Sequence, residues 1–397
     1  MHIFIALLEL AILLFVLLDA FETILLPRRI SRTHRITTFF YRISWLPWAR
    51  ISRLIRSGTR REAFLAYFGP LSLLFLLVIW AFGLICGFAL LQYGVGEHVQ
   101  LAGEKIGIAT LLYLSGSTFF TLGFGDVTPV SGLARVLSVV EAGMGFAFLG
   151  VVVGYLPVIY SSFSKREVQI SLLDARAGSP PTAVELLRRF GACPQGAVLD
   201  AILRDWEHWA AEVLESHISY PVLCTFRSQH ANQSWLAALT TILDATALIL
   251  VGIEAVPMAG QEVDGQTCKQ TPIRPEQAKL TFAMARHAVV DLAQVIGVQY
   301  RTDIPERLAP DGFVVLQQSL AQIGLRLAST PEAEQKLTKL RSLYESYIQS
   351  LGARLLMDLP PWMSTVTRKD NWQGGPWDAR IQAQAPATGR SAGYDHF

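Results

Sequence analysis

Two apolar segments, each long enough to cross a bilayer, flank a short stretch in which glycines alternate with larger residues. The segments are residues 70–91 and 133–160, and the stretch between them includes Thr121, Leu122, Gly123, Phe124, Gly125 and Asp126. Glycine adopts positive φ without steric cost, whereas a neighbouring L-residue stays at negative φ. This alternation turns successive carbonyl groups to one side of the strand. Four such strands around an axis would form rings of oxygen atoms that can replace the water around a cation.

The stretch 121–126 resembles the potassium-channel signature, usually written T-V-G-Y-G-D, with Leu122 in place of Val and Phe124 in place of Tyr. The resemblance extends over the pore module of two-transmembrane, bacterial-like channels, here residues 69–160, with outer helix 70–91, pore helix 107–120, filter 121–126 and inner helix 133–160. It implies a homotetramer, because each chain supplies one of the four filter strands. It also implies K+ at the carbonyl groups of Thr121, Leu122, Gly123 and Phe124, with no cofactor.

Composition supports a membrane location for part of the chain. Of the 397 residues, 51% are hydrophobic and only 17% are charged, which is typical of an integral membrane protein with a soluble part. We therefore expect an all-α membrane protein with three transmembrane helices, a re-entrant pore helix and filter, and a soluble α-helical domain. No C-x-x-C pair occurs among the four cysteines, so neither a metal site nor a disulfide framework is indicated: Cys86, Cys193, Cys224 and Cys268.

The first predicted membrane helix occupies residues 1–26 and contains three acids. It lacks a basic leading region, so we expect it to be retained and not cleaved as a signal peptide. Asp19 and Glu22 share a helix face and are expected to pair with Arg28, Arg29 or the basic stretch that follows. Glu9 lies deeper, either as a functional acid or as a protonated or hydrogen-bonded side chain that faces a neighbouring helix.

Residues 27–68 are strongly basic and carry one acid, Glu62. The positive-inside rule places this stretch in the cytoplasm and the N-terminus outside. Aromatic residues interleave with the arginines, which favours a helix lying in the interface, with its arginines toward anionic lipid headgroups. The spacing of Arg50, Arg53 and Arg56 also resembles a voltage sensor, but only one apolar segment precedes it.

Residues 107–120 are apolar but too short to span a bilayer, so a re-entrant pore helix is predicted. Three side chains are candidates for supporting the filter: Tyr113, Ser117 and Glu141. Tyr113 is expected to donate its hydroxyl to Asp126, or else only to pack. Glu141 is expected behind the filter, hydrogen-bonded to Ser115, Ser117 or Thr118, or else only to stabilise packing.

The inner helix, residues 133–160, contains the candidate gating features. The resemblance places a gating-hinge glycine at Gly145, although close helix packing is an alternative reason for a glycine there. Pro157 removes a backbone donor and is expected to kink the helix. Four apolar residues at helical spacing are predicted to line the pore, as a hydrophobic constriction: Phe146, Leu149, Val153 and Leu156.

Residues 161–363 are expected to form a cytoplasmic helical domain and residues 364–397 a disordered tail. Helical patterns occupy residues 182–190, 195–217, 234–255, 275–297, 312–328 and 331–357. Thr182 is predicted to cap the first of them, with Glu185 completing a capping box. The segment Trp235–Glu254 is apolar enough for a fourth crossing, but Asp244 at its centre favours a buried core helix.

Two clusters in this region carry alternative interpretations. Histidines and glutamates occur within a short span and indicate either a metal site or, more commonly, solvated helix faces: Glu207, His208, Glu212, Glu215, His217 and His230. Aromatic residues nearby indicate either a ligand groove or an ordinary core: Trp206, Trp209, Tyr220, Phe226 and Trp235. No Rossmann fingerprint, nucleic-acid motif or catalytic constellation is present in the sequence, so an enzyme is not expected.

These observations predict a K+-selective channel in the cell membrane, with the filter and N-terminus outside and residues beyond 161 in the cytoplasm. Two alternatives stay open. Phe120 stands where relatives often carry a second Thr, and a loosened filter would make a weakly selective cation channel. The other alternative is a membrane-anchored signalling or scaffold protein whose pore is vestigial. The sequence does not identify the gating stimulus.

Overall fold

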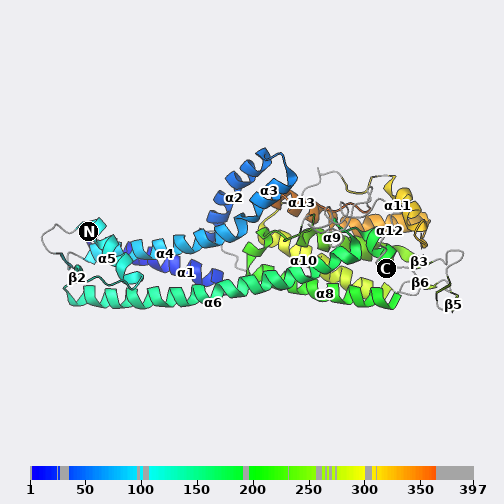
Figure 1. Ribbon diagram of the computed structural model, residues 1–397. Coiled ribbons are helices and arrows are strands. Elements are labelled where there is room, and N and C mark those ends of the chain that lie inside the picture. The colour runs from blue at the N-terminus through cyan, green and yellow to red at the C-terminus, as the bar shows by residue number, and fades with distance from the viewer. Residues whose placement is uncertain are drawn as a thin grey trace, which may run out of the picture.

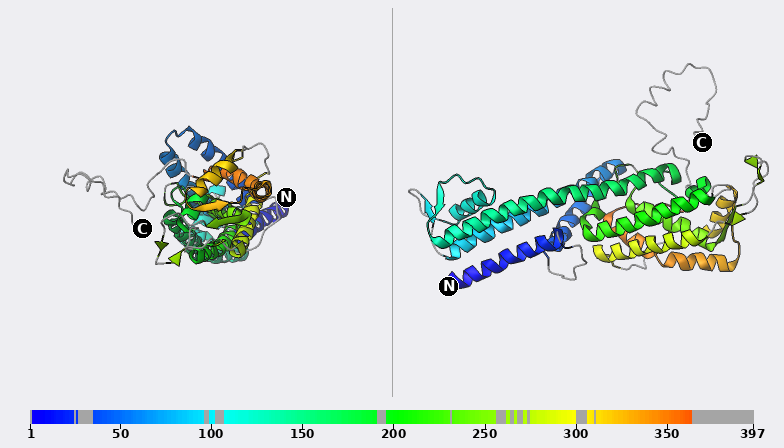
Figure 2. Two further views of the ribbon diagram at one scale, coloured as in Figure 1. Left: turned by 90° about the vertical axis from the view of Figure 1, so that its right-hand side faces the viewer. Right: turned by 90° about the horizontal axis from the view of Figure 1, so that it is seen from below.

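A computed structural model describes residues 2–24, 26, 35–95, 99–101, 107–190, 196–230, 232–255, 262–263, 266–267, 271–272, 275–299, 306–309 and 311–363. The molecule is elongated, and one helix runs along most of its length (Figure 1). The start of the chain and the predicted filter lie at one end, and the helices that follow residue 183 lie at the other (Figures 1 and 2). The expected tail, residues 364–397, lies outside the described residues, as do Arg28 and Arg29.

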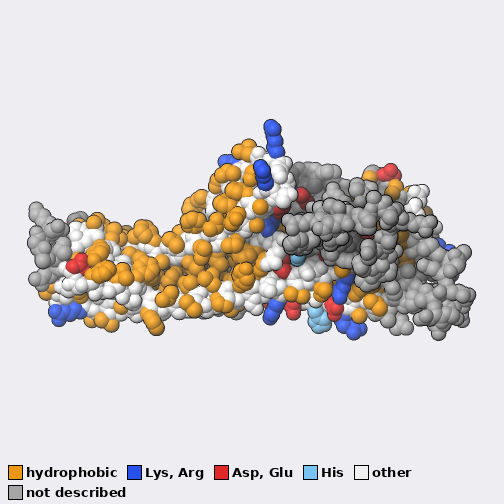
Figure 3. All heavy atoms as spheres, viewed as in Figure 1, with side chains coloured by type: hydrophobic (Ala, Val, Ile, Leu, Met, Phe, Trp, Pro, Cys, Tyr) orange, Lys and Arg blue, Asp and Glu red, His pale blue; other side chains and the backbone are white. Residues whose placement is uncertain are grey.

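The membrane part contains five helices before the long one. Their bounds, with those of two short strands and the long helix, are α1 His2–Ile24, α2 Ile36–Leu54, α3 Gly58–Ala66, α4 Phe68–Val95, β1 Val99–Leu101, α5 Ile108–Phe119, β2 Val127–Pro129 and α6 Gly132–Ala177. The strands β1 and β2 pair antiparallel across the outer end of the filter segment. Hydrophobic side chains cover much of the visible face of this part (Figure 3).

The helix α1 packs along α4 through small residues. Leu13 lies over Gly87 and Val16 over Gly83, where any added Cβ would approach these side chains to 3.1 and 3.3 Å. Glu9 is buried, and its carboxylate lies over Gly94 of the same helix. Glycines allow two helices to approach this closely, because no Cβ stands between them.

Asp19 connects α1 with two other helices at the inner end of the bundle. Its carboxylate accepts hydrogen bonds from Trp80 Nε1 at 2.9 Å and from Thr37 Oγ1 at 2.8 Å. Arg35 lies 3.6 Å from Asp19 and 3.5 Å from Glu22. The prediction that these acids pair with the basic stretch is therefore confirmed, with Arg35 as the partner that the structure describes.

The helices α2 and α3 form a hairpin that stands away from the long axis (Figure 1). Trp45 is buried at its base, 4.8 Å from the Phe68 ring, while Phe39, Ile43 and Leu46 are exposed. The exposed arginines of α2 share this surface with apolar residues (Figure 3). An exposed apolar face beside arginines has the composition expected of a helix in a membrane interface.

The long helix α6 does not end near Tyr160, as expected, but continues to Ala177. Its 46 residues correspond to roughly 69 Å at the usual rise of 1.5 Å per residue. That is about twice the hydrocarbon thickness of a bilayer. Pro157 lies inside the helix without ending it, so the inner helix of the pore module and the first helix of the region after residue 161 are one element.

The second half of the chain is a helical domain with a small sheet. Its elements are α7 Ala183–Phe190, α8 Gly196–Ser219, η1 Pro221–Thr225, α9 Trp235–Gly252, β3 Ile253–Ala255, β4 Glu262–Val263, β5 Gln266–Thr267, β6 Thr271–Pro272, α10 Pro275–Ile296, α11 Gly312–Ala321, β7 Leu325–Leu327, α12 Pro331–Ser342 and α13 Glu345–Leu355. Thr182 Oγ1 accepts a hydrogen bond from the Glu185 amide at 3.2 Å, which confirms the predicted cap. The capping box is wrong, because the Glu185 carboxylate binds Arg188 and Arg189 and the Thr182 amide donates to Ala177 O.

Two helix predictions in this domain are wrong at their ends. The pattern over 312–328 ends as a helix at Ala321, and Leu325–Leu327 instead form β7, the edge of the sheet β6-β3-β7. The pattern over 331–357 is divided into α12 and α13 at Tyr344. Tyr344 is fully buried, and its hydroxyl donates to Asp244 at 2.7 Å, so a tertiary contact decides the break.

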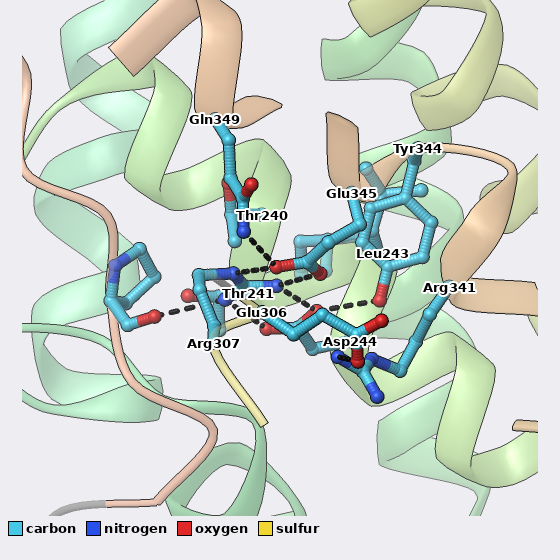
Figure 4. A network of polar contacts seen from close by, with 12 residues as sticks. Thr240, Thr241, Leu243, Asp244, Glu306, Arg307, Arg341, Tyr344, Glu345 and Gln349 are labelled. Carbon is cyan, nitrogen blue, oxygen red and sulfur yellow. Dashed lines mark hydrogen bonds and ion pairs between the residues drawn. The ribbon is translucent and has the colours of Figure 1, made fainter. Parts of the chain in front are cut away.

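The helix α9 is the centre of this domain and not a fourth crossing. Among the described residues, three helical stretches are long and apolar enough to span a membrane, Gly58–Gly94, Gly132–Ala177 and Trp235–Gly252, but 89% of the last is buried inside the protein. Asp244 at its middle binds Arg307 through two bonds of 2.8 and 2.9 Å, and Glu345 binds the same guanidinium (Figure 4). A buried carboxylate is tolerated where it is paired and hydrogen-bonded in this way.

Candidate ion pathway

The predicted filter begins where α5 ends. The Thr121 amide donates to Thr118 O at 3.0 Å and the Leu122 amide to Ser117 O at 2.7 Å, which closes the last turn of the pore helix. Beyond it φ is positive at Thr121, Gly123 and Gly125, with values of 57, 60 and 80°, and not at Leu122 or Phe124. Positive φ therefore occurs at every second residue, as the glycines predict. The pattern begins at Thr121, two residues before the first glycine.

The filter strand is exposed on the surface of the single chain. Every residue from Thr121 to Asp126 is exposed, and Leu122 and Phe124 are 58% and 69% exposed. Among the described residues, none donates a hydrogen bond to a carbonyl group between Thr121 and Gly125. Irregular backbone with open carbonyl groups is tolerated at membrane depth only where it lines a cavity or is covered by protein.

Gly145 of α6 lies against the end of the pore helix. A Cβ at this position would stand 1.9 Å from the Phe119 carbonyl oxygen and 2.7 Å from its carbon. Phe119 itself is buried and contacts Phe148 at 5.8 Å between ring centroids. Because only a glycine allows this approach, the contact provides a packing reason for Gly145 beside the hinge that the resemblance implies.

Behind the pore helix, Glu141 is fully buried and contacts the Ser115 hydroxyl, one of the three partners predicted for it. Ser115 Oγ also lies 2.8 Å from Ile85 O, and Gln92 Nε2 lies 3.5 Å from the second carboxylate oxygen of Glu141. Ser117 instead bonds within its own helix, to Leu114 O. Gln92 was missed in the sequence, although a lone amide in an apolar helix is the signal that could have indicated it.

At the outer end of the filter, the Tyr113 hydroxyl lies within interaction range of the Asp126 carboxylate, the predicted partner. Phe120 is 60% exposed and meets the Phe119 ring edge-on at 5.4 Å. Phe120 therefore supplies no hydroxyl group behind Thr121.

The predicted pore-lining residues divide into two groups. Phe146, Leu149 and Val153 are 73%, 59% and 63% exposed in the single chain. Leu156 is partly buried and packs against apolar clusters formed with α1, α2 and η1. The first three are thus available to face an axis, whereas Leu156 already has partners within its own chain.

Beyond the pore module, a buried polar joint connects α6 to the helical domain. Arg166 is 2% exposed, donates to Leu223 O at 2.9 Å and Phe226 O at 3.0 Å, and pairs with Glu167 at 2.9 Å. Glu167 in turn accepts from the Gln229 amide at 3.2 Å. The buried Arg166–Glu167 pair was not predicted from the sequence, because charged residues just past a membrane segment are usually solvated.

His217 completes this joint. Its Nε2 lies 3.2 Å from Arg166 Nη1, and since a guanidinium only donates, Nε2 accepts and the ring is neutral. Burial, and then the Arg166 charge, lower the pKa of His217 well below its ordinary 6.5. The interpretation of this histidine as part of a solvated helix face is therefore wrong.

The other candidates from the sequence are structural in the described part of the chain. No three His, Cys, Asp or Glu side chains among these residues lie close enough to hold a metal ion. Trp206, Trp209 and Trp235 are buried in the core of the helical domain, which confirms the core interpretation for them. Cys86 and Cys224 are free thiols, whereas Cys193 and Cys268 lie outside the described residues.

Comparison with known proteins identifies an ion-channel segment. Residues 74–161 match the family model described as "Ion channel", which covers most of α4, α5, the filter and the first part of α6. The matched region contains both apolar helices that flank the filter. The comparison thus supports a membrane protein of the ion-channel kind, and it leaves the selectivity for one ion to experiment.

Curated relatives match parts of the chain. The chain is 26% identical over 189 residues to the uncharacterized membrane protein YdjJ of Bacillus subtilis (strain 168), which is 47% of this chain and 54% of that protein. It is 36% identical over 90 residues to protein LctB of Geobacillus stearothermophilus, 20% of this chain and 66% of that protein. The chain thus spans between about half and two thirds of the relatives that it matches. No solved structure matches it.

Proposed function

We propose that this protein is a K+-selective channel formed by four identical chains. The observation that carries the proposal is the filter strand, with positive φ at Thr121, Gly123 and Gly125 and with carbonyl groups that no described residue uses. Four copies around one axis bring the carbonyl oxygens of Thr121, Leu122, Gly123 and Phe124 into stacked rings. Such rings replace the hydration shell of K+, and adjacent sites allow ions to move in single file.

The exposed inner helix supports the same assembly. Only 11% of the most apolar window of α6 is buried within the chain, compared with 56% for α4. Phe146, Leu149 and Val153 then line the pathway below the filter, where a ring of apolar side chains gates by dewetting. In this arrangement the filter and N-terminus lie outside the cell membrane and the helical domain lies in the cytoplasm.

The test is ion flux with the purified protein in liposomes. Gly123→Ala places a Cβ at φ 60°, a conformation that L-residues rarely adopt, and we expect K+ flux to fall at least a hundredfold. Gly132→Ala is the matched control, because this glycine lies in open space at the start of α6 and has no positive φ. Unchanged K+ flux in Gly123→Ala contradicts the proposal.

A reversal potential measured between K+ and Na+ separates the proposal from a weakly selective cation channel. Phe120, which supplies no hydroxyl group behind Thr121, is the observation that favours the weaker filter. We expect K+ to be preferred over Na+ by at least tenfold. A preference near one supports the weakly selective channel, and the absence of any flux in the wild-type protein supports a membrane-anchored scaffold.

A further inference from the structure

A cavity of about 580 Å³ lies where the membrane helices meet the cytoplasmic domain. The last turn of α1, the first half of α2 and the start of α4 form its membrane side, and Tyr155 of α6 also lines it. On the other side lie η1, the end of α10 and the end of α13. Trp45 Nε1 donates to Arg354 O at 3.0 Å, and this bond holds α2 against α13 at the wall of the cavity.

Two arginines line the cavity without an acidic partner. Arg42 on α2 lowers the pKa of Arg354 on α13, after the larger effect of burial, so the two guanidinium groups lie close enough to repel each other. No carboxylate among the described residues lies within ion-pair distance of either group. A third arginine, Arg35, is already paired with Asp19 and Glu22. Two like charges that line one cavity repel each other, and an anion bound between them would be attracted by both.

Part of the cavity wall is apolar. Phe68 and Leu76 come from α4, Tyr155 from α6, and Val222 from η1. The first three belong to helices of the membrane part, so this wall begins at the inner surface of the bilayer. A soluble anion would satisfy the arginines and leave this wall bare, and a neutral lipid would cover the wall and leave the arginines unpaired.

We propose that the cavity binds one anionic phospholipid, with its phosphate between Arg42 and Arg354 and the start of an acyl chain along Phe68, Leu76 and Tyr155. Guanidinium groups bind phosphate oxygens through paired, charge-assisted hydrogen bonds, which gives the site its preference for an anion. Burial of the acyl carbons contributes about 0.8 kcal/mol per methylene group. The proposal does not depend on ion conduction.

The position of the cavity gives the bound lipid a second effect. Tyr155 and Val222 belong to the apolar cluster in which α6 packs against η1, beside the Arg166 joint. A lipid that touches both residues stabilises the present arrangement of the inner helix relative to the cytoplasmic domain. Anionic lipid therefore acts on the middle of α6, where the helix passes from the pore module to the Arg166 joint.

The test measures lipid binding to the full-length protein, purified in detergent and depleted of lipid. Phosphatidylglycerol and phosphatidylcholine with the same acyl chains are titrated separately, and the thermal midpoint and the number of retained lipids by native mass spectrometry are recorded. We expect phosphatidylglycerol to bind at least tenfold more tightly and to raise the midpoint. Glycerol 1-phosphate and inorganic phosphate, which lack the chain, are expected to leave the midpoint unchanged at the same concentrations.

Variants locate the binding. Arg42→Ala with Arg354→Ala is expected to weaken phosphatidylglycerol binding roughly a hundredfold, about tenfold for each arginine. Arg50→Ala with Arg53→Ala is the matched control, because it removes the same charge from exposed positions of α2 that do not line the cavity. Arg42→Ala alone changes an exposed residue and preserves the test if the double variant does not fold.

Three results overturn the proposal. Equal affinity for the two lipids shows that charge is not recognised. An equal loss in the control pair shows that the basic surface of α2, and not the cavity, attracts the lipid. The same stabilisation by glycerol 1-phosphate as by phosphatidylglycerol shows that the ligand is a soluble anion.

Discussion

The two halves of α6 have the same backbone and opposite surroundings. Above Tyr160 the helix is apolar and mostly bare in the single chain, with Val139 and Phe146 each 73% exposed. Below Tyr160 it carries charged residues, yet Arg166, Glu167 and Asp174 are buried by helices of the same chain. Apolar side chains of the upper half are exposed, and charged side chains of the lower half are buried. This is the reverse of what hydrophobicity predicts for a soluble protein.

This difference indicates where each half finds its partners. The upper half lies among apolar helices at membrane depth, where exposed leucine and phenylalanine cost nothing and identical copies can complete the surface. The lower half is held to the helical domain of the same chain by buried hydrogen bonds from Arg166 to Leu223 O and Phe226 O. One continuous helix therefore connects the helical domain with the residues that follow the filter.

The largest effect on stability is expected from a substitution in the part of α6 below Tyr160. Arg166→Ala leaves Glu167 buried without its cation and two backbone carbonyl groups without a donor, so the free energy of unfolding should fall by about 3–5 kcal/mol. Thermal unfolding of the full-length protein in detergent measures it. Lys165→Ala, one residue earlier and exposed, should change the midpoint little. Equal midpoints for the two variants would show that the joint does not hold α6.

A substitution in the part of α6 above Tyr160 is expected to act on K+ flux, because it displaces the pore helix that leads into the filter. Gly145→Ala forces a Cβ toward the Phe119 carbonyl, and relief of this overlap displaces α5 at a cost of about 1–3 kcal/mol. We expect K+ flux to fall at least tenfold in liposomes, with a smaller loss of thermal stability than in Arg166→Ala. Gly150→Ala, at a position with open space in the single chain, is the control. Normal flux in Gly145→Ala would mean that the close contact does not position the filter.

The smallest expected effect is the pH dependence of stability that His217 contributes at the Arg166 joint. The folded chain keeps His217 neutral because its pKa is lowered, whereas the unfolded chain protonates the ring below its ordinary 6.5. The contribution to stability is therefore complete above pH 6.5 and decreases as the pH falls, by at most about 1.4 kcal/mol per pH unit. Unfolding midpoints between pH 7.5 and 5 should show this slope in the wild-type protein.

His217→Gln removes the titrating group, so it should flatten that slope. His208→Gln, at an exposed position nine residues earlier on the same helix, should retain it. If both variants keep the wild-type dependence, another group is responsible for the pH effect.

Much of the membrane part could be predicted from short-range patterns. The glycine alternation indicated the backbone of residues 121–126, and the length of the apolar run indicated a pore helix, which the structure has at Ile108–Phe119. The contact between Glu141 and Ser115 was also predicted, because an acid inside an apolar helix must find a polar partner nearby.

The errors occur where a distant residue decides a local structure. The helix expected over 331–357 breaks at Tyr344, whose hydroxyl binds Asp244 of α9, a hundred residues earlier in the chain. The end of α6 depends on Arg166, whose carbonyl acceptors lie in the segment that follows α8. Neither partner is visible in a periodicity that covers ten to twenty residues.

The sequence by itself determined the apolar helices of the pore module, the filter backbone and the basic stretch before them, because hydrophobic length, glycine and charge act over a few neighbouring residues. Only the tertiary structure decided that the inner helix extends into the cytoplasmic domain, that α9 is a core helix, and that Arg42 and Arg354 share a cavity. Those outcomes depend on burial and on pairing between segments far apart in the chain, and both arise only when the helices pack.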